Sequence, residues 1–485
     1  MSGKYDAIII GSGIGGLTCG AFLARAGMRV LVLEQHIKIG GYAHNFKRRK
    51  YVFESGIHSV SLSKDGFIMY LLRLLGIEDC IETVAFPEMF SIRNPEYSLV
   101  MPAEKEAICE YLYMSFPHQK DNINNFLKQI ELFNSNIIQP QYAYEQQYMQ
   151  ERVEFVSQFH NTSYQKFISS IFTDNKLCDL FYGQWPYVGS SPEYGPALFS
   201  FMMYVVHFLE GSHFCRNGFS TIADALASVI IQRGGAIKTK CRVTSLAVEG
   251  KKAYSVFTET GEEINADIFI SNCSPYLLHN HLIEEEYRGK RWQKRLAGLH
   301  PSTSCVIVYL GMKPGFDALL PHYITFWYDS LDNKRIFQNV LDNRKEQIDH
   351  LIFLRTVDKP EYPTLTLMNF VQKSYSTDWK HEKMRIAEKM LVKAEKLYPG
   401  LKEYIVCMDV GSPGTFERYT LNTEGAIYGF ENTRNMYGEA KMPYTTHIKN
   451  LFQTGHWGKP GCGIWNVMSN AYAVSKIILM SQKSM

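Results

Sequence analysis

Three glycines and one carboxylate near the start of the chain have the spacing needed to hold a dinucleotide. Gly11, Gly13 and Gly16 follow the apolar run Ala7–Ile10. In this order they allow a tight turn, a close approach of the backbone to a phosphate, and close packing of a helix on a strand. Glu34 follows at about the 20-residue offset expected of the acid that binds a ribose hydroxyl. An acid at this position also argues against a 2′-phosphate.

These residues require a strand, a helix and a second strand in the right order. Residues 7–10 read as a strand buried on both faces. In the helix that follows, Gly16, Gly20 and Leu23 share one face, so small residues can pack on the sheet. Gly27 suits the helix exit, and Arg29–Glu34 reads as the second strand. The helix start would offer free N–H groups to a pyrophosphate.

A second glycine-rich turn lies at the far end of the chain, within Leu451–Ile464. Two such turns, one at each end, indicate that the dinucleotide is FAD and that it extends across the whole fold. No second strand–GxGxxG–helix unit is visible for a nicotinamide cofactor. Electrons are therefore expected to pass to oxygen, a quinone or another carrier, or never to leave in a net isomerisation.

Composition excludes several classes. The chain has 485 residues, 46% of them hydrophobic and 20% charged, which predicts two or three domains with ordinary cores. The ten cysteines form no CxxC pair and no zinc-like cluster, so we expect a reducing, cytoplasmic protein without a metal site. The net charge of +3 and the absence of a basic, aromatic-rich face argue against a nucleic-acid partner. We see neither a signal peptide nor an apolar run of about 18 residues.

Element patterns alternate along the chain. Residues 1–85, 214–290 and 401–485 carry the glycine turns and short apolar strands, whereas 86–213 and 291–400 mix helices with longer strands. The predicted fold is therefore α/β: a discontinuous Rossmann-type FAD-binding domain with an inserted α+β substrate domain. Helices are expected at Ala103–Ser115, Asp121–Asn136 and Tyr164–Phe172, and strands at Cys241–Val248, Tyr254–Glu259, Ala266–Asn272, Cys305–Leu310, Tyr323–Trp327 and Thr364–Phe370.

The order of these segments resembles the flavin amine-oxidase superfamily. Within it, the chain is most similar to the phytoene desaturase, carotenoid isomerase and retinol saturase group, with retinol saturases as the nearest likeness. The similar stretches cover both ends and the middle of the chain: Gly11–Gly16, Glu34–His36, Gly40–Gly41, Phe53–His58, Arg216–Leu226, Ala266–Cys273, Arg418–Gly429 and Thr454–Ile464.

The resemblance implies an FAD-dependent oxidoreductase. Such an enzyme desaturates, saturates or isomerises a carbon–carbon bond of an apolar polyene, isoprenoid or lipid-like substrate, with hydride transfer at flavin N5. Two alternatives stay open: a flavin amine oxidase acting on a C–N bond, and a non-catalytic FAD-binding protein. Hydrogen peroxide released with amines would identify the first, and flavin that no donor reduces would identify the second.

By motif and resemblance, two sets of site residues are predicted. The expected proton donors or substrate clamps are His58, Arg216, Arg418, Tyr419 and His456, each of which could instead be an ordinary structural residue. The expected FAD-binding residues are Gly11, Gly13, Ile14, Gly15, Gly16, Glu34, Gln35, Gly40, Gly41, Tyr42, Val243, Asn272, Gly455, His456, Gly463 and Ile464.

Two positions depart from the superfamily pattern. Many members have Arg after the glycine pair, near the pyrophosphate, whereas this chain has Tyr42. That charge contact is therefore missing or supplied from elsewhere. Cys462 lies where some amine oxidases attach flavin covalently, although a small residue fitting beside the flavin is the simpler interpretation.

Three further stretches have a plain interpretation and a functional one. Lys47–Lys50 is basic but suits a charged hairpin turn. Arg288–Arg295 could give peripheral contact with anionic lipid headgroups, or could be a solvated helix. Leu198–Leu209 is the most apolar stretch, and a buried helix or pocket wall is favoured over dipping into a membrane.

Overall fold

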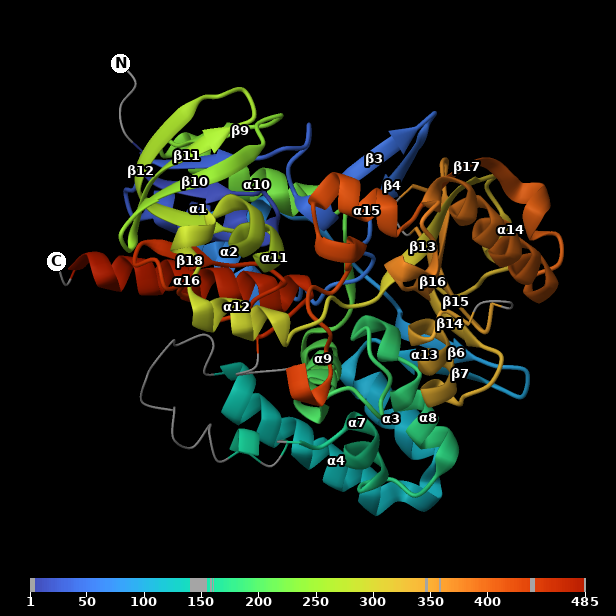
Figure 1. Cartoon of the computed structure of the whole chain (residues 1–485). Helices are drawn as coiled ribbons and strands as arrows, with labels where there is room; N and C mark the ends of the chain where they lie inside the picture. Colours follow the sequence, from blue (N-terminus) through green and yellow to red (C-terminus); the bar gives the residue numbers. More distant parts are fainter. Residues whose placement is uncertain are drawn as a thin grey trace.

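Two seven-stranded sheets and a group of helices make up the molecule (Figure 1). A computed structural model describes residues 5–139, 155–157, 159, 161–344, 348–356, 359–436 and 441–483. In Figure 1 the first sheet lies at the upper left, the second sheet at the right, and the helical group at the bottom.

The first sheet is the predicted dinucleotide-binding sheet. Its parallel core runs in the order β9–β2–β1–β12–β18, and β10 and β11 extend it beside β12 as antiparallel strands. The strands are β1 (Tyr5–Ile10), β2 (Val30–Leu33), β9 (Ala236–Lys238), β10 (Val243–Glu249), β11 (Lys252–Thr258), β12 (Glu263–Ser271) and β18 (Leu451–Gln453). Its members come from three distant stretches of the chain, as the sequence predicted.

Helix α1 (Ile14–Arg25) lies against the sheet and contacts α10 (Ser220–Gln232) and α16 (Ile464–Lys483). Glycines make this packing close. A Cβ on Gly16 would lie 2.2 Å from the carbonyl oxygen of Gly11, and one on Gly20 would lie 2.8 Å from Ile9 and 2.9 Å from Ile230. The predicted packing role of these two glycines is confirmed.

The second sheet belongs to the predicted substrate domain. Its order is β17–β13–β16–β15–β14–β6–β7, antiparallel except for the β14–β6 pair. The strands are β6 (Glu88–Arg93), β7 (Ser98–Pro102), β13 (Ser304–Met312), β14 (Ile324–Tyr328), β15 (His350–Arg355), β16 (Thr364–Val371) and β17 (Ile405–Gly411). Helix α14 (Trp379–Leu397) contacts β13 and β17, and α13 (Asn333–Leu341) contacts β16.

One predicted boundary needs correction. Strand β17 lies in the 401–485 stretch that the sequence assigned to the FAD-binding domain, yet it pairs with β13 of the second sheet from Ile405 to Gly411. Its exposed and half-buried residues alternate over most of its length, so it lacks the continuous apolar run of the neighbouring strands. The second-sheet part therefore extends beyond residue 400.

The helical group contains α3 (Lys105–Ser115), α4 (Lys120–Phe133), α7 (Tyr164–Ser169), α8 (Asn175–Tyr182) and α9 (Ala197–Glu210). The three predicted helices of this region are confirmed with small shifts at their ends. Most of α9 is buried, which agrees with the prediction of a buried helix for Leu198–Leu209. In the described part of the chain, no helix is long and apolar enough to cross a membrane.

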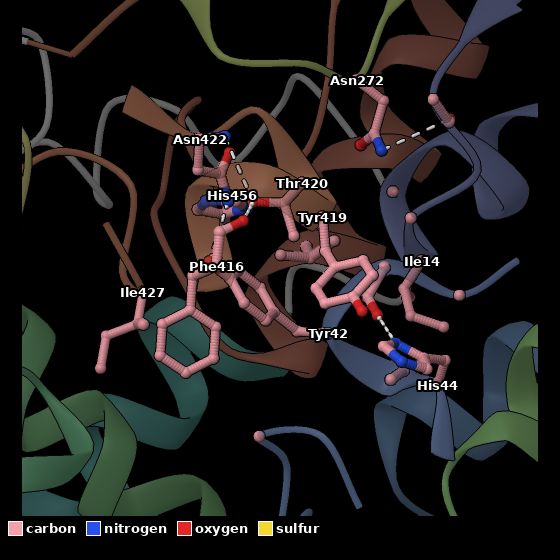
Figure 2. Close-up of a pocket in the computed structure, with 18 of the residues that line it drawn as sticks. Ile14, Tyr42, His44, Asn272, Phe416, Tyr419, Thr420, Asn422, Ile427 and His456 are labelled. Atoms are coloured by element: carbon pink, nitrogen blue, oxygen red, sulfur yellow. Dashed lines mark hydrogen bonds between the residues drawn. The ribbon is translucent and has the colours of Figure 1, made fainter. Parts of the chain in front are cut away.

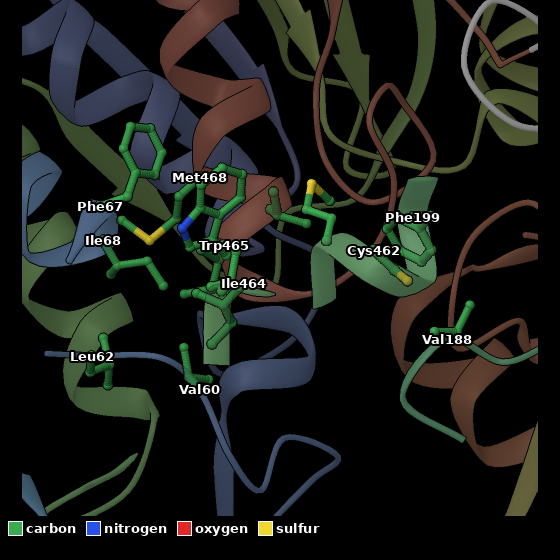
Figure 3. Close-up of a cluster of buried hydrophobic side chains, with 14 of the residues drawn as sticks. Val60, Leu62, Phe67, Ile68, Val188, Phe199, Cys462, Ile464, Trp465 and Met468 are labelled. Carbon is green, nitrogen blue, oxygen red and sulfur yellow. The ribbon is translucent and has the colours of Figure 1, made fainter. Parts of the chain in front are cut away.

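Smaller elements join these parts. Lys47–Lys50 lies in the hairpin of β3 (Asn45–Arg48) and β4 (Tyr51–Glu54), as predicted. Strands β5 (Thr83–Ala85) and β8 (His213–Cys215) pair with each other. The remaining helices include α2 (Phe67–Leu75), α11 (Pro275–Leu277), α12 (Lys290–Ala297) and α15 (Pro413–Thr420). Figure 3 shows part of the main core, where Phe67 of α2 contacts Trp465 of α16 with their rings 4.8 Å apart.

Candidate functional site

The opening glycine turn packs directly on the closing one. Gly11 has φ +96°, which only glycine adopts readily. A Cβ on Gly13 would lie 2.7 Å from Asn272 Nδ2, and one on Gly15 would lie 2.7 Å from Asn272 Oδ1 and 2.8 Å from Gly455 Cα. Side chains are thus excluded where the two turns meet, and Asn272, at the end of β12, fills the space between them (Figure 2).

Glu34 lies at the end of β2 with its carboxylate tied to the glycine turn. One carboxylate oxygen accepts hydrogen bonds from the backbone N–H of Ser12 at 2.8 Å and from its hydroxyl at 2.6 Å. The other oxygen accepts from the N–H of His36 at 2.8 Å. Glu34 is 8% exposed and lines the main cavity, so its oxygens are oriented where a ribose would be expected.

The second glycine pair also touches the opening turn. Gly40 and Gly41 have φ of +104° and +58°, and a Cβ on Gly41 would lie 3.1 Å from Gly13 Cα. The next residue, Tyr42, donates its hydroxyl proton to the carbonyl oxygen of Ala426 at 3.0 Å and accepts from Asn422 Nδ2 at 3.1 Å. Burial raises the pKa of Tyr42 to about 12, so this side chain brings no charge to the pyrophosphate region.

Asn470 holds the closing glycine turn in place. Its Oδ1 accepts from the Thr454 hydroxyl at 2.6 Å and from the Gly455 N–H at 3.1 Å, while its Nδ2 donates to the carbonyl oxygen of Lys459. Asn470 lies on α16 and is fully buried. Sequence reasoning missed it, because a single Asn in an apolar helix matches no motif.

A cavity of about 300 Å³ lies between these turns, the second sheet and α9 (Figure 2). Most of the predicted FAD-binding residues line it: Gly11, Gly13, Ile14, Gly15, Glu34, Gln35, Gly40, Gly41, Tyr42, Val243, Asn272, His456, Gly463 and Ile464. Gly16 and Gly455 lie behind this lining, in the packing described above. The structure thus brings the set together, and the contacts with FAD itself stay predictions.

Two of the predicted acid–base residues, His58 and His456, line the cavity with unpaired ring nitrogens. Neither ring nitrogen of His58 has a hydrogen-bond partner in the described structure, and neither does Nε2 of His456. The His58 ring stacks on Tyr187 with centroids 5.6 Å apart. Burial lowers the pKa of His58 to about 4 and that of His456 to about 3, so both are neutral near pH 7.

The other three predicted groups lie at or beyond the edge of the cavity. Arg216 is half exposed and forms an ion pair with Glu82 at 2.5 Å, outside the cavity lining. Arg418 also lies outside the lining, with its guanidinium 4.6 Å from the ring of Tyr419. Tyr419 lines the cavity but is 41% exposed, and its carbonyl oxygen accepts from Gln35 Nε2 at 3.0 Å. Neither arginine lines this cavity, and their contact with a substrate stays a prediction.

A buried lysine, Lys441, packs against the closing glycine turn near Gly461. Lys441 Nζ donates to Asn432 Oδ1 at 2.7 Å, and Asn432 Nδ2 donates to the sulfur of Cys462 at 3.4 Å. Burial lowers the pKa of Lys441 to about 8 and raises that of the Cys462 thiol. Cys462 lines the cavity, and its attachment to flavin stays a prediction. Sequence reasoning did not single out Lys441, because no pattern marks an isolated lysine as buried.

Comparison with known families decides which class of protein this is. The family model described as flavin containing amine oxidoreductase matches residues 14–459. The chain belongs to this family. It is accordingly an FAD-dependent oxidoreductase with a Rossmann-type FAD-binding fold.

Curated relatives are similar over nearly the whole chain. All-trans-retinol 13,14-reductase of Homo sapiens is 25% identical, with 98% of this chain and 86% of the relative covered. Prolycopene isomerase 2 of an Oncidium hybrid cultivar is 27% identical, covering 95% and 81%. A 4,4′-diapophytoene desaturase of Methylomonas sp. is 23% identical, covering 100% and 96%.

Solved structures confirm the fold. An oxidoreductase from Methanosarcina mazei superposes with a TM-score of 0.65 at 17% identity, covering 97% of this chain and 100% of that one. A variant of putrescine oxidase gives a TM-score of 0.67 at 14% identity, covering 99% of each chain.

Three observations indicate that the residues lining the cavity suit FAD. Gly13, Gly15 and Gly41 leave no room for side chains, which is what a backbone approaching a pyrophosphate requires. Glu34 presents an ordered carboxylate at the cavity wall. The start of α16 reaches the same cavity through Gly463 and Ile464, so its dipole can favour negative charge on a flavin.

Proposed function

We propose that the enzyme uses FAD to desaturate, saturate or isomerise a carbon–carbon bond of an apolar polyene, isoprenoid or lipid-like substrate. The names of its relatives support this, since they comprise a retinol reductase, a prolycopene isomerase and a diapophytoene desaturase. Bound FAD would supply the site that accepts or gives a hydride. The remaining tasks fall to the protein: binding the substrate, excluding water and handling protons.

The observation that carries the proposal is the chemistry of the cavity wall beyond the glycine turns. The second sheet, α9 and the loops beside them contribute neutral side chains, and none of these described residues is Asp, Glu, Lys or Arg. They include Tyr187, Met203, Cys305, Ile307, Met368, Phe416 of α15, Ile427 and Tyr428, and the polar but uncharged Thr420 and Asn422 lie beside them. An apolar wall of this kind stabilises a hydrocarbon substrate by burial and offers a charged amine no counter-ion.

Among the residues that line the cavity, His58 is the side chain best suited to handle a proton. Its ring is neutral near pH 7 and both nitrogens are unpaired. The hydroxyls of Tyr42 and Tyr428 are less suited, because they already donate to the carbonyl oxygens of Ala426 and Pro186. Burial also raises the pKa of both tyrosines. We therefore assign proton transfer at the substrate to His58.

The test is anaerobic incubation of the purified FAD enzyme with all-trans-retinol, prolycopene and 4,4′-diapophytoene, each with oxidised and with dithionite-reduced flavin. We expect one of these polyenes to change the flavin spectrum and to yield a product altered at a carbon–carbon bond, detected by mass spectrometry and chromatography. Putrescine and cyclohexylamine serve as controls. Peroxide released with an amine, and no reaction with any polyene, would overturn the proposal in favour of C–N oxidation.

The electron acceptor and a membrane contact are proposed on narrower grounds. The described chain has a single strand–glycine–helix unit of the kind that binds a dinucleotide, so we propose an electron acceptor other than a nicotinamide nucleotide.

Helix α12 exposes Lys290, Arg291 and Lys294, and we propose that these side chains contact anionic lipid at a membrane surface. Sedimentation with vesicles containing phosphatidylserine tests the contact, and charge reversal at Lys290 and Arg291 should reduce it.

A further inference from the structure

Beside the apolar cavity lies a group of polar side chains, each of which has at least one buried nitrogen or oxygen atom without a hydrogen-bond partner in the described structure, although His207 Nδ1 lies 2.8 Å from the carbonyl oxygen of Met203. Three come from the segment 58–61, three from the end of α9 and the residues after it, and one from the first turn of α16. They are His58, Ser59 and Ser61; His207, Glu210 and Ser212; and Trp465.

The segment 58–61 and the residues that follow α9 lie side by side because their backbones form a hydrogen-bonded pair. The N–H of Val60 donates to the carbonyl oxygen of His213 at 3.0 Å, and the N–H of His213 donates back at 2.8 Å. Near the cavity, Tyr187 stacks on His58 at 5.6 Å and on His207 at 6.1 Å.

At the other end of the group is a buried carboxyl, that of Glu210. One of its oxygens accepts from the N–H of Phe67 at the start of α2, at 3.3 Å, and the other has no direct partner. The Ser61 hydroxyl and the Trp465 indole are the side chains that face it from the neighbouring segments.

Buried polar groups without protein partners are normally hydrogen-bonded to internal water. We propose that ordered waters link the unpaired groups into a proton path, with His58 at the cavity end and Glu210 as the proton reservoir at the other end. This inference rests on the proposed function, since it supplies the proton that accompanies hydride transfer.

The chemistry balances in both directions. In desaturation, one substrate carbon loses a hydride to oxidised FAD and its neighbour loses a proton, and the electrons of the second C–H bond become the new π bond. His58 accepts that proton on one ring nitrogen and releases another from its second nitrogen into the path, where the Glu210 carboxylate takes it up. In saturation, bound reduced FAD would supply the hydride, and the proton moves from Glu210 through the path and His58 to the substrate carbon.

Two properties of the end groups suit this role. Neither nitrogen of His58 makes a hydrogen bond of good geometry, and the nearby Gly56 backbone only partly offsets the lowering of its pKa by burial, so the ring can accept and donate together without remaining a cation. Burial raises the pKa of Glu210 to about 7, although the Phe67 N–H, Ser61 and Trp465 act to lower it. Both protonation states of the carboxyl therefore exist near neutral pH.

Other titratable groups near the path do not compete with the reservoir. His207, one turn before Glu210 on α9, has its pKa lowered by burial. His213, from the paired segment, has its pKa lowered to about 4 by burial and by His207. Burial therefore favours the neutral form of both histidines.

The carboxyl of Glu210 also supports the start of α2, so the test must separate that structural role from proton storage. Glu210→Gln keeps an oxygen acceptor for the Phe67 N–H and removes only the titration. The matched control is Asp179→Asn on α8 of the helical group. Asp179 is a partly buried carboxyl whose pKa is also raised by burial, and it accepts a hydrogen bond from the Tyr97 hydroxyl.

The first measurement needs no substrate. Infrared difference spectra of the FAD enzyme between about pH 6 and about pH 8 should show loss of a protonated carboxyl band, as expected from a pKa of about 7. That change should be absent from Glu210→Gln and retained in Asp179→Asn. If wild type and Glu210→Gln give the same difference spectrum, Glu210 is not the reservoir and the proposal is overturned.

The second measurement uses the polyene that wild type converts. Glu210→Gln should slow product formation by on the order of 10- to 100-fold with normal FAD content. The pH step near 7 should vanish in this variant and persist in Asp179→Asn; in wild type, saturation slows and desaturation accelerates as pH rises through it. An unchanged profile would overturn the path. If wild type converts no polyene, the proposed function fails, while the infrared titration still decides the state of Glu210.

Discussion

Gly15 and Gly455 lie in contact although 440 residues separate them: a Cβ on Gly15 would come within 2.8 Å of Gly455 Cα. The first turn begins α1 and the second follows β18, so this contact joins the two ends of the chain across the parallel sheet. Neither turn can move away from the other without opening the cavity wall, and a side chain at either glycine should therefore affect FAD binding.

Gly15→Ala should weaken FAD retention. The added methyl would meet the Gly455 backbone and Asn272 Oδ1, and overpacking of this kind costs about 1–3 kcal/mol. If the whole cost falls on the bound state, it corresponds to a rise of roughly 5- to 150-fold in the Kd for FAD. Flavin fluorescence titration of the apoprotein measures it. Gly298→Ala is the control, because its methyl would meet nothing closer than 3.6 Å; equal affinities for the two variants would contradict the steric argument.

Glu34→Ala should also reduce FAD retention, through loss of a hydrogen-bond acceptor. The change leaves the N–H groups of Ser12 and His36 without their partner and removes the acid expected at the ribose. The flavin-to-protein absorbance ratio after gel filtration gives the result, with Glu262→Ala, an exposed partner of Lys238, as control. A variant that keeps stoichiometric flavin with unchanged affinity would show that the ribose assignment is wrong.

Cys462 provides a direct test of how flavin is held. Burial raises the pKa of its thiol, which disfavours the reactive thiolate. We therefore expect denatured wild-type protein to release all of its flavin into the supernatant, and Cys462→Ser to behave alike. Flavin that remains with precipitated wild type but not with Cys462→Ser would establish a covalent link and reverse this expectation.

Sequence patterns predicted the parts of the site that depend on local backbone geometry. The turns at Gly11 and Gly455 follow from glycine spacing, and Glu34 from its place at the end of a strand. Sequence patterns could not show whether a side chain is buried or exposed. Arg216 lies in a stretch that resembles the superfamily, yet its guanidinium pairs with Glu82 in solvent.

Three other failures have a related cause. Asn470 and Glu210 act through partners that are distant in sequence, which periodicity cannot reveal. The residues of β17 were placed in the FAD-binding domain because their alternating burial carries little apolar signal, and only the register of β17 with β13 shows that they belong to the second sheet. Local sequence patterns therefore predicted the glycine turns and Glu34, whereas the rest of the cavity wall depends on packing between residues that are distant in sequence.

Buried neutral histidines predict loss of stability in mild acid. Burial lowers the pKa of His58, His213 and His279 to about 4, below the unfolded value of 6.5. Between these values these three histidines bind more protons in the unfolded chain than in the folded one, so their contribution to folding stability is complete above about pH 6.5 and declines as pH falls toward 4. The combined loss should reach several kcal/mol, on the order of 1.4 kcal/mol per pKa unit for each fully buried group.

His279 offers the cleanest single test, because it lies outside the cavity lining. His279→Gln removes one titrating group while keeping a polar side chain beside Trp292, on which the imidazole stacks. Urea denaturation at about pH 7 and at about pH 5 should show a smaller difference for this variant than for wild type, since one group fewer takes up a proton on unfolding. His281→Gln, which makes the same change at an exposed histidine, is the matched control for the wild-type difference. If His279→Gln also keeps it, then His279 is not held neutral by burial, and the acid sensitivity must come from the other histidines.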